Sequence, residues 1–175
     1  LEDQRIFDPL RPSFQRLGQT VDVHYPPILD ELPIKKPQIQ DFAALVAQKN
    51  EIRKEDLLIG HSFGGWAAAN IQQQIGNPVV QLCSFTDPAH ICKPALVWAL
   101  RNGLVQAGLL KTRLPHYAIE YRYKGKPSLE AIRICRSVMK EWPNDRLVKV
   151  LRLMNFPALS TANAPLLRLH GAKDK

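Results

Sequence analysis

The chain has few cysteines and no motif that would place them in a metal site or a disulfide framework. Three cysteines, Cys83, Cys92 and Cys135, are an odd number, and no two form a Cys-x-x-Cys pair. We therefore expect reduced thiols, which are typical of a cytoplasmic protein. Neither a metal nor another cofactor is predicted.

Long hydrophobic runs are also lacking. No apolar stretch approaches the roughly 20 residues that a membrane span needs, so no transmembrane segment is predicted. The charged start of the chain, Leu1–Arg5, has no apolar core of a signal peptide. Because the first residue is not Met, we expect a processed, trimmed or partial chain.

The positive charge is scattered rather than clustered. The formal net charge is +8, and the cations are densest between Lys111 and Lys140. Nucleic-acid binding would need a patch, so we favour a solvated loop, with attraction of an anionic substrate as an intermediate interpretation. A hydrophobic content of 45% with 23% charged residues is typical of a globular domain, and 175 residues suit a single one spanning 1–175.

Helical and strand patterns alternate along the first half of the chain. The alternation predicts an α/β fold, a predominantly parallel sheet with helices on both faces. After Pro88 it gives way to a mostly helical insertion over 91–164, with pieces near 93–110, 128–142 and 144–154. The predicted helices begin near Asp8, near Ile39 and just after Ser62, and the predicted strands are Thr20–Tyr25, a run from Leu57, Val79–Phe85 and Pro165–Gly171.

The most informative stretch is a Gly-x-Ser-x-Gly motif between an apolar run and an alanine-rich segment. This order predicts a strand, a sharp turn and a helix, with Ser62 at the apex in an unfavourable backbone conformation. Gly60 and Gly64 would lack side chains where strand and helix crowd each other. The alternative interpretation is a glycine-rich turn with a buried, inert serine.

With this motif, the helical insertion and the ending Pro165–Asp174, a strand followed by Gly-x-x-Asp, the chain resembles the α/β-hydrolase superfamily. The resemblance implies a serine hydrolase acting on a carboxylic ester or thioester, a small-molecule acyl substrate that is apolar or anionic. It implies that 91–164 is a lid, part of which roofs an apolar acyl pocket; the alternative is that its apolar face packs on the helices of the sheet. The implied site is Ser62 as nucleophile, Asp174 as acid with Asp87 as the alternative, the Phe63 N–H as oxyanion donor, and the elbow residues Gly60, His61, Gly64 and Gly65.

Two parts of the family pattern are not found. These are the strand ending in His-Gly before the first helix, and the catalytic histidine beyond the acid. The five histidines are His24, His61, His90, His116 and His170, and none fills the base role by position. We therefore expect the biological protein to be longer, and this chain to turn over esters poorly on its own.

Two other functions stay open. One is a non-catalytic, truncated or degenerate hydrolase that acts as a binding protein. The other is a serine acyltransferase, although there a Glu commonly stands where this chain has Gly65. The residues do not distinguish an esterase, thioesterase, lactonase or peptidase, nor do they give the oligomeric state.

Overall fold

The described part of the protein is built around a small parallel sheet. The computed structural model describes residues 7–8, 10–16, 22–28, 38–85, 98, 102–105, 107–108, 141–154 and 167–169. Strands β1 (Leu58–His61), β2 (Val79–Leu82) and β3 (Leu167–Leu169) pair in parallel in the order β1-β2-β3. The predicted α/β character with a parallel sheet is therefore confirmed for these ranges.

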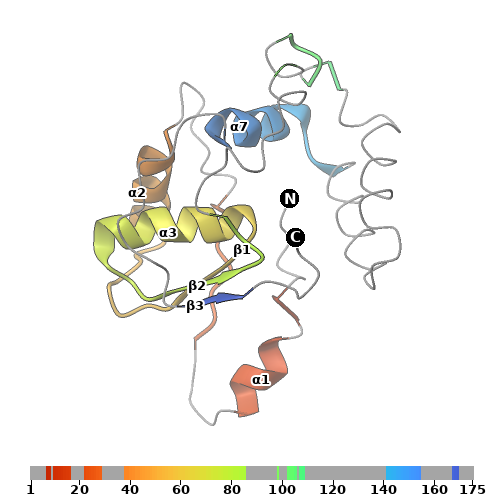
Figure 1. Cartoon of the computed structure of the whole chain (residues 1–175). Coiled ribbons are helices and arrows are strands. Elements are labelled where there is room, and N and C mark those ends of the chain that lie inside the picture. The colour runs from red at the N-terminus through yellow and green to blue at the C-terminus, as the bar shows by residue number, and fades with distance from the viewer. Residues whose placement is uncertain are drawn as a thin grey trace.

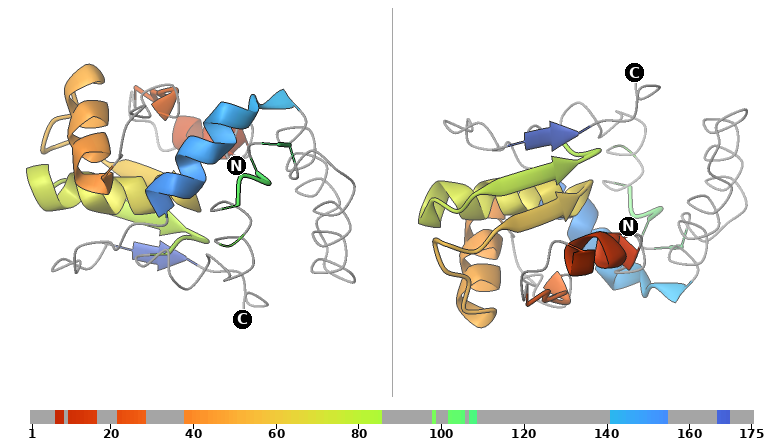
Figure 2. Two further views of the ribbon diagram at one scale, coloured as in Figure 1. Left: turned by 90° about the horizontal axis from the view of Figure 1, so that it is seen from above. Right: turned by 90° about the horizontal axis from the view of Figure 1, so that it is seen from below.

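The long helices gather on one side of the sheet. Helices α2 (Ile39–Lys49), α3 (Phe63–Ile75) and α7 (Asn144–Met154) all lie above the strands, and the short α1 (Arg11–Arg16) lies apart below them (Figures 1 and 2). Helix α3 contacts both β1 and β2, and α2 packs on α3. The order of layers is therefore sheet, α3 and then α2.

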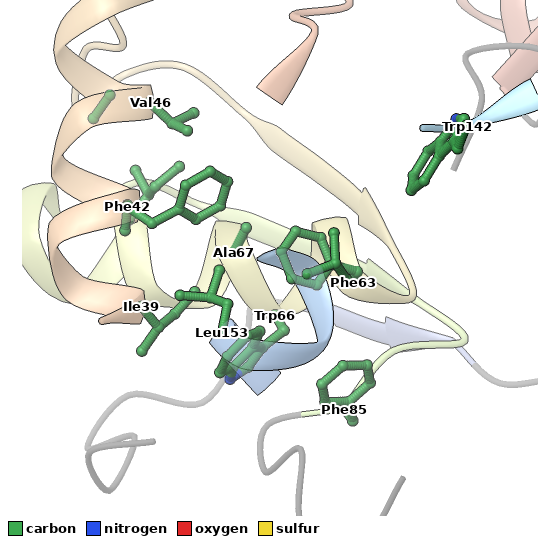
Figure 3. Close-up of a cluster of buried hydrophobic side chains, with 13 residues drawn as sticks. Ile39, Phe42, Val46, Phe63, Trp66, Ala67, Phe85, Trp142 and Leu153 are labelled. Atoms are coloured by element: carbon green, nitrogen blue, oxygen red, sulfur yellow. The ribbon is translucent and has the colours of Figure 1, made fainter. Parts of the chain in front are cut away.

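The core forms where the apolar faces of these helices meet. Ile39, Phe42 and Val46 of α2 recur at helical spacing and are all at most 1% exposed. Trp66 of α3 and Leu153 of α7 are fully buried in the same cluster, which Figure 3 shows in close-up. Helix α7, which belongs to the predicted insertion, thus takes part in the main core.

The end of α3 is determined locally. Gly76 has a left-handed φ of 87°, and its N–H donates to the Gln72 carbonyl at 2.7 Å. The buried Asn77 side chain then donates to the carbonyls of Arg53 and Asp56. This confirms the predicted stop and ties the start of β2 to the loop before β1.

Several predictions for the first part of the chain need correction. The strand predicted at Thr20–Tyr25 does not form over its described residues, because 22–25 are not part of the sheet and Val23 is 39% exposed. An alternating pattern makes a strand only where a neighbour completes the hydrogen-bonded ladder, and no strand in the described ranges does so. The helix near Asp8 forms, but it begins at Arg11.

The predicted insertion is described only in parts. Its last helical piece is confirmed as α7. In the piece near 93–110, Asn102–Val105 and 107–108 form turns, because Gly103 and Gly108 adopt left-handed φ values of 74° and 90°. The piece near 128–142 lies outside the described residues, apart from 141–142.

Part of the second face of the sheet is open. The Gln81 side chain points toward α3, so its neighbours Val80 and Leu82 face the other side, together with their β3 partners Leu167 and Leu169. Those two leucines are 47% and 49% exposed. Helices on both faces are therefore not found over β3 in the described part of the chain.

Within the same ranges, no helix has the length and hydrophobicity of a membrane span.

The packing of α7 on the core can be tested with one buried leucine. We expect Leu153→Ala to lower the free energy of unfolding by about 2–5 kcal/mol, because it leaves a cavity beside Trp66. The matched control, Leu169→Ala, removes the same atoms from a half-exposed site and should cost about 1 kcal/mol or less. Urea denaturation followed by circular dichroism measures both, and equal losses would contradict the packing of α7.

Candidate active site

Ser62 alone makes the turn between β1 and α3. The strand ends at His61, the helix begins at Phe63, and Ser62 has φ 51° and ψ −116°. A non-glycine residue in such a conformation stores roughly 1–3 kcal/mol of strain. The predicted strand–turn–helix geometry with unfavourable dihedrals at Ser62 is therefore confirmed.

The turn is possible because the two backbones meet without side chains between them. A Cβ on Gly60 would lie 2.5 Å from the backbone of Gly64 and of Gly65. A Cβ on Gly65 would in turn lie 2.5 Å from the Cβ of Ser84. The predicted role of Gly60 is confirmed, and Gly64 supplies part of the backbone that Gly60 faces.

The backbone of Ser62 is hydrogen-bonded to β2 and to the residues that follow it. Its N–H donates to the Leu82 carbonyl at 3.1 Å. Its carbonyl accepts from the Ser84 hydroxyl at 2.6 Å and from the Trp66 N–H at 3.3 Å. The Ser62 side chain is half-buried and makes no capping bond to the first turn of α3. Its hydroxyl is therefore not occupied in capping the helix.

The N-terminus of α3 gives the turn a positive potential. The helix has 13 residues and no acidic residue in its first turn. Its first N–H groups lack intrahelical acceptors, so negative charge is favoured beside Ser62. The Phe63 N–H, the predicted oxyanion donor, is the first of these groups.

Aromatic rings hold the first turn of α3 against α2 and the residue that follows β2. The Phe63 ring is 4% exposed and lies 5.9 Å from that of Phe42 and 5.8 Å from that of Trp66, between ring centroids. Trp66 stacks on Phe85, which follows β2, at 5.8 Å (Figure 3). This chain of rings links α2, the first turn of α3 and the residue Phe85 that follows β2.

The other predicted site residues follow strands that end at the same edge. Asp87 comes after β2 and Asp174 after β3, and parallel strands have their carboxyl ends together. Both acids lie outside the described residues, as do His90, His116 and His170, so the separation predicted between Ser62 and Asp174 stays a prediction.

The two remaining histidines are described. His61 is the half-buried last residue of β1, and His24 is exposed. In the described ranges no three His, Cys, Asp or Glu side chains gather as a metal site would require.

Sequence reasoning missed the polar residues of β2 and its extension. Gln81 and Ser84 are 0% and 6% exposed. The Gln81 side chain donates a hydrogen bond to the Gly65 carbonyl in the first turn of α3, and the Ser84 hydroxyl donates one to the Ser62 carbonyl just before that helix. The available signal was a polar residue inside an apolar strand, since a buried polar side chain requires a partner. The pattern could not show which partner each has.

Comparison with known proteins gives no relative from which a function could be inferred. The chain matches no protein-family model, no curated protein and no solved structure. What can be said about function therefore depends on Ser62 and on the groups that contact it.

The close approach at Gly60 can be tested by adding a methyl group. We expect Gly60→Ala to cost about 3 kcal/mol, because the methyl would meet backbone that has no rotamer to change. The control Gly103→Ala has open space around its Cβ and only a positive φ, so about 1 kcal/mol is expected. Urea unfolding curves give both values, and the opposite ranking would argue against the close contact.

Proposed function

We propose that the chain carries the nucleophile of a serine hydrolase that acts on carboxylic esters or thioesters. The observation that supports this most is the strained conformation of Ser62 at a strand–helix turn. Such strain persists only where the surroundings impose it, and it concentrates at functional sites. The Gly-x-Ser-x-Gly motif and the resemblance to the α/β-hydrolase superfamily point the same way.

In the proposed reaction the Ser62 Oγ attacks the carbonyl carbon of the substrate. A base takes the hydroxyl proton, an oxyanion forms, and the leaving alkoxide or thiolate departs with a proton to leave an acyl-serine. The Phe63 N–H and the positive end of α3 stabilise the oxyanion. Water then releases the acid and regenerates Ser62.

The proposed acid lies outside the described part of the chain. Asp174, or Asp87 as the alternative, would orient a histidine base, a role that none of the five histidines of this chain fills by its position. Val150 and Leu153 of α7 pack into the core, so we assign the lid over an apolar acyl pocket to the earlier part of 91–164. The exposed thiol of Cys83 fits the proposed cytoplasmic location.

The proposal is tested by acylation with p-nitrophenyl acetate. A single round of acylation reports on the nucleophile even where turnover is slow. We expect an acetyl group on Ser62, located by peptide mass spectrometry. Release of p-nitrophenolate should fall by about 10²-fold or more in Ser62→Ala. The matched control is Ser13→Ala, which removes an exposed hydroxyl from α1 and should react like the wild type.

The outcomes separate the candidate functions. Equal p-nitrophenolate release in Ser62→Ala, or acetyl groups only on other residues, would contradict the proposed nucleophile. A folded wild-type chain whose Ser62 does not react would favour the non-catalytic binding protein.

A further inference from the structure

Two buried polar side chains of β2 and its extension are not used by the proposed reaction. Gln81 is 0% exposed and Ser84 is 6% exposed. Burying a polar group is costly unless it is hydrogen-bonded. The partners of these side chains therefore indicate what each contributes to the fold or to the site.

Ser84 bonds to the residue that carries the strain. Its hydroxyl donates to the Ser62 carbonyl at 2.6 Å, which is shorter than the 3.3 Å bond from the Trp66 N–H. On the other side of the same residue, the Ser62 N–H donates to the Leu82 carbonyl at 3.1 Å. One short segment, Leu82–Ser84, thus bonds to both peptide groups that flank Ser62.

These two bonds, together with the weaker one from the Trp66 N–H, constrain the backbone conformation of Ser62. The angles φ and ψ describe how the peptide groups before and after a residue are rotated relative to each other. Leu82 orients the group before Ser62, and Ser84 orients the group after it. Because φ 51° is unfavourable for serine, removal of either bond lets the turn relax.

The peptide group that Ser84 orients also contains the proposed oxyanion donor. In a trans peptide the carbonyl and the N–H point in opposite directions. The Ser62 carbonyl is directed toward the interior by the Ser84 hydroxyl, so the Phe63 N–H of the same peptide points away from Ser84. A hydrogen bond to the carbonyl also polarises the peptide and strengthens its N–H as a donor.

Gln81 anchors the same region one turn later. Its Nε2 donates to the Gly65 carbonyl at 2.8 Å, and its Oε1 accepts from the Arg168 Nε at 2.9 Å. A guanidinium only donates and a carbonyl only accepts, so both ends of the amide are determined. β2 is thereby joined to β3 and to α3, and gives Ser84 a rigid support.

We propose that Ser84 is a positioning residue of the site. Through its hydrogen bond to the Ser62 carbonyl it sets the orientation of the Ser62–Phe63 peptide and directs the Phe63 N–H toward the substrate oxyanion. This inference rests on the proposed function.

The test compares Ser84→Ala with the wild-type full chain in acylation by p-nitrophenyl acetate. Loss of this hydrogen bond should lower the maximal acylation rate by about three- to tenfold. The KM should stay unchanged, because the oxyanion forms only in the transition state. Ser84→Thr keeps the hydroxyl and should restore the rate.

The control for a purely structural effect is Asn77→Ala. It removes buried side-chain bonds to backbone carbonyls at the opposite end of β2. It should lower stability and leave the acylation rate unchanged. Crystal structures of the wild type and Ser84→Ala add a readout independent of activity, and the peptide after Ser62 should be rotated in the variant.

Three results would overturn the inference about Ser84 alone. These are an unchanged acylation rate in Ser84→Ala, an equal loss of rate in Asn77→Ala, and a peptide after Ser62 with the same orientation in both crystal structures. Failure of the wild-type chain to acylate at Ser62 would instead overturn the proposed function on which the inference rests.

Discussion

The backbone of β1 approaches the first turn of α3 so closely at Gly60 that no side chain fits between them. The chain must therefore reverse within a single residue, and Ser62 takes a positive φ because a wider turn would separate the strand from the helix. Gly65 continues this close contact, because a Cβ there would lie 2.8 Å from the Gly60 carbonyl oxygen and 2.5 Å from the Ser84 Cβ. The strain at Ser62 is thus a consequence of the distance between two elements, and its cost is offset by the core that this distance allows.

Strand β2 lies at the centre of the arrangement. It pairs with β1 on one side and β3 on the other, and the side chains of Gln81 and Ser84 reach α3 and the turn before it. Polar groups at such a position restrict the packing more than apolar ones, because a hydrogen bond requires direction as well as distance. This explains how a strand of four residues can hold a strained turn in one conformation.

The parts of the fold that could be predicted from the sequence are those whose signals are local. Ile39, Phe42 and Val46 show the buried face of α2, and Gly76 shows the end of α3. The strand expected at Thr20–Tyr25 does not form over 22–25, because a strand requires a partner, which no pattern within one segment can supply. The role of Ser84 was out of reach because its bond joins residues 22 apart and depends on the packing of β2 on α3. The motif was sufficient to place Ser62 at the turn, whereas Asp174 and Asp87 stay predictions.

Strand β3 is much farther in sequence from the strand it pairs with than β1 and β2 are from each other. β1, α3 and β2 form one continuous unit from Leu58 to Leu82, whereas the Arg168–Gln81 bond joins residues 87 apart. Closing so long a loop costs conformational entropy before any contact compensates for it, so pairing of this kind forms late in folding and opens first. The turn at Ser62 thus belongs to a unit that can form early. It needs only β1, α3 and β2, so it should persist through a local unfolding event that releases β3 from the sheet.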